Sequence, residues 1–233
     1  MQRVPTAELL DEDCGTPLEV AESLDDLWNI NRWLGGVSGS MKLLLRFFAR
    51  SGLRSARILD VGCGDARMAA NLREKLHRHG FPAKLFVLDR QLSHLQSHSG
   101  TLNGAIPLIG DALELPLAAG SLDIVMCNLF LHHFSGENAK RLLRGLATVA
   151  ARAVLINDLE RRAVAHFISR HFRPFSRSPI TRHDAPASVR QAYTRDELRI
   201  LIEESGFHDY DLVRLPMFRL GLILWKQPEA QKS

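Results

Sequence analysis

A short apolar run that leads into a glycine-rich turn constrains this chain most. Residues 57–67 read RILDVGCGDAR, and Met68, Ala69 and Leu72 follow at helical spacing. The pattern predicts a strand buried on both faces that passes through a tight turn into a helix. Such a turn lets a ligand lie against bare backbone. The residues therefore predict an α/β fold with a small-molecule site at the end of this strand.

The charges around the turn indicate which ligand suits it. In a dinucleotide fingerprint, glycines at the first, third and sixth positions admit a pyrophosphate to a helix N-terminus. Here the sixth position is Arg67, and Asp60 and Asp65 would repel a pyrophosphate. The turn therefore favours a ligand with a positive centre. A nicotinamide-dependent oxidoreductase and a non-catalytic nucleoside-binding protein remain the alternatives from other classes.

Length and composition exclude several classes of protein. The 233 residues suffice for one α/β domain with appended helices, and 45% hydrophobic with 24% charged residues is typical of globular proteins. A net charge of +4 is too mild to indicate nucleic-acid binding. The chain shows neither an apolar run of about 20 residues for a membrane span nor a signal-peptide core. We therefore expect a cytoplasmic protein without an integral membrane segment; the oligomeric state is left open.

From residue 56 onward, short apolar runs alternate with helical patterns, which indicates a parallel sheet with helical crossovers. Ser135 and the capping box Thr194–Glu197 predict two helix starts. The last two runs lie close together around Pro216 and predict an antiparallel hairpin. Strands are predicted at residues 57–61, 84–88, 106–109, 122–127, 153–157, 210–215 and 218–225.

The region before the sheet is predicted to be helical. Residues 1–22 show no clear period and are expected to form a loose leader, with Ser23 as the N-cap of a helix that ends at Gly35-Gly36. Asn31 falls on the apolar face of this helix, where a polar side chain is usually hydrogen-bonded. We expect residues 1–50 to form a helical lid on a domain of residues 51–233.

Polar residues follow the predicted strands, and ligands of open parallel sheets bind at those carboxyl ends. Asp89 ends the second strand at the distance from the glycines that suits a carboxylate accepting both hydroxyls of a ribose. The other strands end near Asp111, near Asn128 and at Asn157-Asp158. Each of the first five predicted strands therefore ends near a polar residue that a ligand could contact.

Several of these stretches, taken in order, resemble class I S-adenosylmethionine-dependent methyltransferases. They are ILDVGCG at 58–64, Asp89, GDALELP at 110–116, SLDIV at 121–125 and LHHF at 131–134. The resemblance spans roughly residues 56–226. It implies a Rossmann-like seven-stranded sheet with strand order 3-2-1-4-5-7-6, the last strand antiparallel, and S-adenosyl-L-methionine as cofactor.

The resemblance also implies the cofactor contacts. Asp60, Gly62 and Gly64 would line the methionine portion, and Asn128 would meet its amino group through a carbonyl. Asp89 would hold the ribose, and Asp111 with the backbone of Ala112 would hold the adenine. Arg32 and Arg90 complete the expected set. No metal is expected, because the fourth strand ends in Cys127-Asn128 and lacks the carboxylate of catechol-type members.

Three further stretches, NINRWLGG at 29–36, INDLERR at 156–162 and RHDAPASVR at 182–190, are similar to bacterial methyltransferases associated with polyketide and other secondary metabolism. This similarity implies a small, partly apolar acceptor. The expected reaction is O-methylation of a phenolic or polyketide-like molecule. C-methylation of a quinone-type substrate is the alternative.

A hydroxyl acceptor has to lose its proton, and histidine is the side chain suited to this near neutral pH. His132 and His133 lie just past the fourth strand. Because adjacent residues on a turn are not expected to face one ligand together, at most one would be catalytic, and His133 is favoured. Structural roles for both are the alternative. His183, beside Asp184, is a second candidate base.

Residues 160–192 are predicted to form a cap inserted between the fifth strand and the capped helix. Seven arginines in this segment are interleaved with Phe167, Phe172 and Phe175. One interpretation is a cover over the acceptor pocket, and another is a solvated basic face. A third is adhesion of the cap to an anionic membrane.

Overall fold

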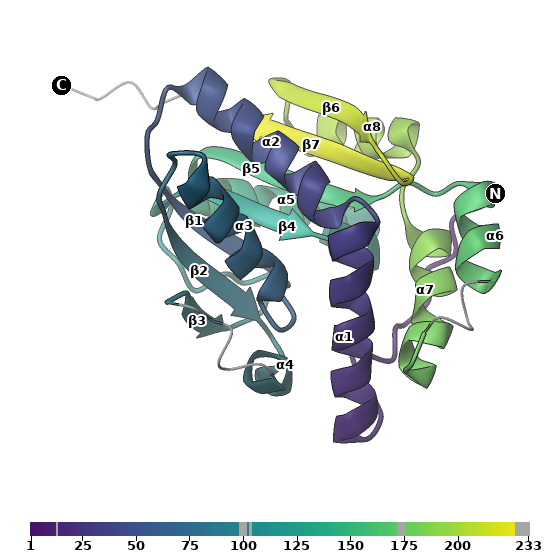
Figure 1. Cartoon of the computed structure of the whole chain (residues 1–233). Helices are drawn as coiled ribbons and strands as arrows, with labels where there is room; N and C mark the ends of the chain where they lie inside the picture. The colour runs from purple at the N-terminus through teal and green to yellow at the C-terminus, as the bar shows by residue number, and fades with distance from the viewer. Residues whose placement is uncertain (13, 98–101, 103, 172–175, 227–233) are drawn as a thin grey trace.

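The computed structural model describes residues 1–12, 14–97, 102, 104–171 and 176–226. Its centre is a seven-stranded sheet with the order β3-β2-β1-β4-β5-β7-β6 (Figure 1). All pairs are parallel except those of β7, which runs antiparallel to β5 and β6. The strands are β1 (Ala56–Val61), β2 (Ala83–Asp89), β3 (Ile106–Ile109), β4 (Leu122–Asn128), β5 (Ala150–Leu159), β6 (Tyr210–Leu215) and β7 (Arg219–Trp225). The expected strand order and hairpin are confirmed.

Helices cover both faces of the sheet. On one face, α2 (Gly36–Ser51) and α3 (Arg67–Arg78) bury Phe47 and Leu72 against Ile58 of β1. On the other face, α5 (Gly136–Val149) and α8 (Arg195–Glu204) bury Leu142 and Ile202. The short α4 (Leu92–Ser97) follows β2. These two apolar layers fix the carboxyl ends of the strands, where the site lies.

The first helix, α1 (Pro17–Trp33), begins earlier than the sequence prediction, so the expected leader over residues 17–22 and the Ser23 cap are wrong. Thr16 and Glu19 form a capping box, and Pro17 opens the helix at the position where a missing N–H costs nothing. Ser23 is instead buried, with its hydroxyl 3.0 Å from Thr181 Oγ1. The predicted starts after Ser135 and Thr194 are confirmed.

The predicted cap contains α6 (Ala163–His171) and α7 (Pro179–Gln191), which pack on each other, and α7 also packs on α1. Phe172 and Phe175 of the predicted cap lie outside the described residues. A 3-10 turn, η2 (Leu131–His133), follows β4. Among the described residues, no helix is long and apolar enough to cross a membrane.

Candidate active site

A cavity of about 510 Å³ opens at the carboxyl ends of the strands. It brings together almost every residue that the sequence predicts for the site, but Arg32 and His183 do not line it. The guanidinium of Arg32 lies 5.0 Å from the ring of Trp33, and the half-exposed ring of His183 pairs with Asp184. The predicted residues that line the cavity are Asp60, Gly62, Gly64, Asp89, Arg90, Asp111, Ala112, Asn128, His132 and His133.

The glycine turn after β1 is hydrogen-bonded to the end of β2. Gly62 and Gly64 have φ values of +67° and +57°, which favour glycine. A Cβ on Gly62 would lie 2.5 Å from the ring of Phe130, so the turn admits no side chain there. The amide of Gly64 donates to the Asp89 carboxylate at 2.8 Å. The same carboxylate accepts from the amide of Gln91 at 2.9 Å and is thereby held at the cavity wall.

Asp60, at the end of β1, is anchored by a chain of buried polar groups. Asn128 Nδ2 donates to Asp60 Oδ1 (2.9 Å), and Ser40 Oγ donates to Asn128 Oδ1 (2.6 Å). Asn157 in turn donates to Ser40 at 2.9 Å. Burial raises the pKa of Asp60 to about 7 despite the bond from Asn128, and the charge of Asp89 adds to the rise.

The charges beside the turn suit a phosphate-free ligand with a positive centre. Asp60, Asp65 and Asp89 surround it, whereas Arg67 is turned away. The guanidinium of Arg67 pairs with Asp25 at 2.6 Å and with Asp65. This arrangement therefore places carboxylates, rather than a free arginine, where a ligand would contact the turn.

The N-terminal segment, residues 3–11, crosses the site, which the sequence did not predict. Arg3 donates to the carbonyls of His132 and Phe134, both at 2.9 Å, and its guanidinium lies 4.2 Å from the ring centre of Tyr193. At the other end of the segment, the carbonyl of Asp11 accepts from Arg90 at 3.1 Å. Acidic side chains in this segment can therefore reach the cavity. Whether residues 1–50 act as a lid stays a prediction.

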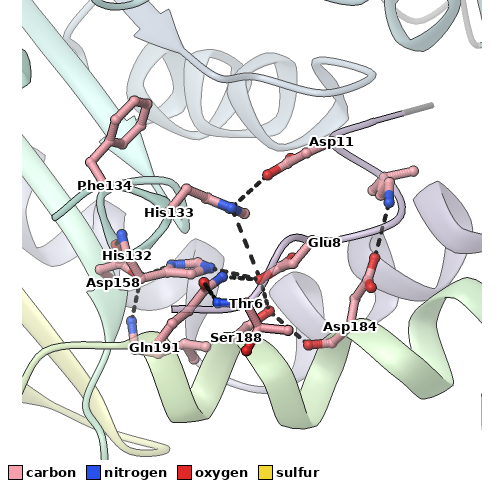
Figure 2. A network of polar contacts seen from close by, with 12 residues as sticks. Thr6, Glu8, Asp11, His132, His133, Phe134, Asp158, Asp184, Ser188 and Gln191 are labelled. Carbon is pink, nitrogen blue, oxygen red and sulfur yellow. Dashed lines mark hydrogen bonds and ion pairs between the residues drawn. The ribbon is translucent and has the colours of Figure 1, made fainter. Parts of the chain in front are cut away.

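The imidazole ring of His132 lies between two carboxylates (Figure 2). Its Nδ1 lies 2.6 Å from Asp158 Oδ1, and its Nε2 lies 3.5 Å from Glu8 Oε1. Burial lowers the pKa of this ring, but Asp158 and Glu8 outweigh burial and raise it to about 10. Burial raises the pKa of Asp158, but the neighbouring His132 lowers it by more, so that it lies below its ordinary value. His132 is therefore a buried cation at neutral pH.

His133 has a different environment. Its Nδ1 lies 2.6 Å from Asp11 Oδ2 and 4.0 Å from Glu8 Oε1. Both histidines line the cavity, with ring centres 4.2 Å apart, so the expectation that adjacent residues cannot share one site is wrong. The physical reason is that carboxylates from residues far away in the chain draw both rings toward the same space (Figure 2).

Helix α7 holds the N-terminal segment in place. Ser188 and Gln191 both donate to Glu8 Oε1. Asp184 accepts from the amides of Leu9 and Leu10 at 3.0 and 3.1 Å. Glu8 is buried, and although burial raises the pKa of its carboxyl group, the neighbouring His132 and His133 lower it further than burial raises it. The functional residues that sequence reasoning missed, Glu8 and Asp11, belong to no motif and lie more than a hundred residues from the histidines.

The far end of the cavity contains a buried arginine. Arg219, the first residue of β7, donates through Nε to the Leu34 carbonyl at 2.9 Å and through Nη2 to Asn31 Oδ1 at 3.3 Å. Burial lowers its pKa to about 10. Asn31 is thus hydrogen-bonded, as expected for a polar residue on the apolar face of α1.

Comparisons with known proteins agree on the fold. A model of the methyltransferase domain family matches residues 58–153. A SAM-dependent methyltransferase from Aquifex aeolicus superposes with a TM-score of 0.63 at 18% identity, covering 91% of this chain and 98% of that chain. The plantazolicin methyltransferase BpumL in complex with SAH gives 0.65 at 16% identity, with coverages of 90% and 96%.

A magnesium protoporphyrin IX methyltransferase from Synechocystis with bound SAM gives a TM-score of 0.54 at 14% identity, covering 82% of this chain and 81% of that chain. No curated protein sequence matches this chain. The match to the methyltransferase domain family over residues 58–153 and the strand order agree with the resemblance to class I S-adenosylmethionine-dependent methyltransferases, and the superpositions show the same Rossmann-like fold.

Proposed function

We propose that this enzyme transfers the methyl group of S-adenosylmethionine to an oxygen of a small, largely apolar acceptor of phenolic or polyketide-like character. The observation that carries the proposal is the pairing of His133 with Asp11 on the cavity wall. A carboxylate that holds one ring nitrogen of a histidine leaves the other nitrogen to accept a proton.

The ends of β1 to β4 form the cofactor half of the cavity in this proposal. Gly62 and Gly64 allow close approach, and Asp60 and Asn128 receive the positively charged methionine part. Asp89 receives the ribose, and Asp111 and Ala112 the adenine. S-adenosylmethionine supplies a methyl group already activated by the sulfonium. The protein therefore has only to align the acceptor and remove its proton.

The acceptor half consists of η2, the N-terminal segment and the cap. Most of the lining of the whole cavity is apolar, which favours an acceptor with a large apolar part. His132 does not serve as the base, because it already carries a proton at neutral pH. His133 takes the acceptor proton at Nε2, and Asp11 holds the ring through Nδ1. The apolar lining residues include Leu10, Leu27, Phe130, Ala165, Val189 and Met217.

C-methylation of a quinone-type acceptor is the second candidate, since the same deprotonation activates the ring carbon next to a phenolate. The named acceptors of similar structures, plantazolicin and magnesium protoporphyrin IX, support methyl transfer without favouring either atom. The position of the new methyl group separates the two candidates. Mass spectrometry and NMR of the product from an alkylresorcinol or a hydroquinone give that position.

The test of the base is His133→Ala. We expect kcat to fall by about 10²- to 10⁴-fold with unchanged affinity for S-adenosylhomocysteine in calorimetric titration. His183→Ala is the control and should retain full activity, because His183 lies outside the cavity lining. Full activity of His133→Ala would contradict the assignment. Tight binding of NADH without binding of S-adenosylhomocysteine would support an oxidoreductase instead.

A further inference from the structure

Helix α6 presents apolar side chains to solvent where a cap helix would ordinarily bury them. Val164, Phe167 and Ile168 are 58%, 62% and 47% exposed, and Ala165 is the only buried residue of the helix. At 100° per residue, the three exposed side chains form one continuous apolar face. A contiguous apolar face of this kind indicates an interaction surface, whereas apolar residues that are exposed singly do not.

The apolar face of α6 borders the cavity. Ala165, Ile168 and Ser169 of the same helix line it, so Ile168 belongs to both the exposed face and the cavity wall. In Figure 1, α6 is the outermost helix on its side of the molecule, with α7 between it and α1. The exposed face is therefore accessible to a large partner, and it leads directly into the acceptor half.

The surroundings of this face are strongly basic. Residues 161–183 contain six arginines and no acidic residue, although the whole chain has a net charge of only +4. Arg170 of α6 is exposed three residues after Phe167, a spacing that makes the two side chains neighbours on the helix surface, and the exposed Arg162 directly precedes the helix. Arg177, just before α7, and Arg182, within it, are also exposed. An apolar face edged by arginines has the charge that complements an anionic lipid surface.

We propose that α6 docks on an anionic membrane surface, with Val164 and Phe167 entering the headgroup region and the neighbouring arginines binding the lipid phosphates. The acceptor then passes from the bilayer along Ile168 into the cavity. It is a molecule with a polar, methylatable head and a long apolar chain. This identity of the acceptor rests on the proposed function, whereas the membrane surface itself does not.

The test is sedimentation of the full chain with vesicles of phosphatidylcholine alone and of phosphatidylcholine mixed with phosphatidylglycerol. We expect binding to the anionic vesicles only, and weaker binding at high salt because the charges are exposed. The double variant Val164→Ser/Phe167→Ser should lower the partition coefficient about tenfold or more. Ile200→Ser, which removes an equally exposed isoleucine (48%) from α8, is the matched control and should bind like the parent chain.

The charge contribution is tested separately with Arg162→Gln/Arg170→Gln, which should lower binding to anionic vesicles about tenfold or more. Thermal unfolding and S-adenosylhomocysteine binding should be unchanged in all variants, so that loss of vesicle binding cannot be confused with misfolding or with failure of the proposed function. The membrane proposal is overturned if the parent chain does not sediment with anionic vesicles or if both double variants sediment like it. Dimerisation that disappears in Val164→Ser/Phe167→Ser would assign the face to a second copy of the chain.

Discussion

The cofactor half and the acceptor half of the cavity are held together by different interactions. In the cofactor half, the carboxylate of Asp89 is held by main-chain amides of the neighbouring loops. In the acceptor half, side chains make the contacts: His132 lies between the carboxylates of Glu8 and Asp158, and Asp11 Oδ2 lies 2.6 Å from His133 Nδ1. The first half therefore depends on backbone geometry, and the second depends on the protonation of a buried network. Removal of a charge from the network of Glu8, His132 and Asp158 should therefore act mainly on the second half, whereas in the first half a change of pH acts on Asp60, whose pKa burial raises to about 7.

The largest expected effect is on stability and comes from His132→Asn. This change leaves Asp158 and Glu8 as buried carboxylates without the cation between them, which should lower the free energy of unfolding by about 3–5 kcal/mol. Denaturant unfolding monitored by circular dichroism measures it. The matched control is His133→Asn, whose partner Asp11 is partly exposed, and it should cost about 1 kcal/mol or less. Equal losses in the two variants would show that the environments of the two rings do not differ as described.

A smaller effect is expected in the cofactor half from Asp89→Asn. Asparagine keeps the size of the side chain but loses the charge that strengthens bonds to ribose hydroxyls, so affinity for S-adenosylhomocysteine should fall about 10- to 100-fold. Calorimetric titration measures this. Asp123→Asn, at the amino end of β4 where the carboxylate binds Arg57, is the control and should leave the affinity unchanged. An unaltered affinity for Asp89→Asn would refute the ribose assignment.

The same contrast explains what could be predicted from the sequence. The glycine turn, Asp60 and Asp89 lie in or directly after strands that the hydrophobic runs predict. Since the strand order that the family resemblance implies is the observed one, topology alone brings these residues together. Glu8 could not be predicted as a site residue, because its approach to His132 depends on hydrogen bonds from Ser188 and Gln191. Side-chain contacts between distant segments leave no periodic signal.

A further effect, comparable in size to the loss of affinity in Asp89→Asn, concerns pH. The pKa of His132 is about 10 in the folded protein against an ordinary value of 6.5, so its contribution to stability is complete below the ordinary value and disappears as the pH rises toward 10. The free energy of unfolding should therefore fall from about pH 7 to pH 9, by up to about 1.4 kcal/mol per pH unit from this group. Comparison with His132→Asn isolates the effect, since the difference in stability between the two proteins should shrink over this range. A constant difference would contradict the raised pKa.

The smallest expected effect tests whether the acceptor half uses protons or a metal. Single donor atoms of Glu8, His132 and His133 lie within 4.8 Å of one another, a set that could hold a metal ion. The absence of a metal stays a prediction, and the ion pairs of these groups support it. Asp11 already engages Nδ1 of His133, and a metal bound there would displace this carboxylate and deprive the base of the group that orients it. Dialysis against a chelator should therefore leave kcat unchanged, and added Zn²⁺ should inhibit by competing for His133. Loss of activity on chelation, restored by a divalent ion, would instead make the three residues metal ligands.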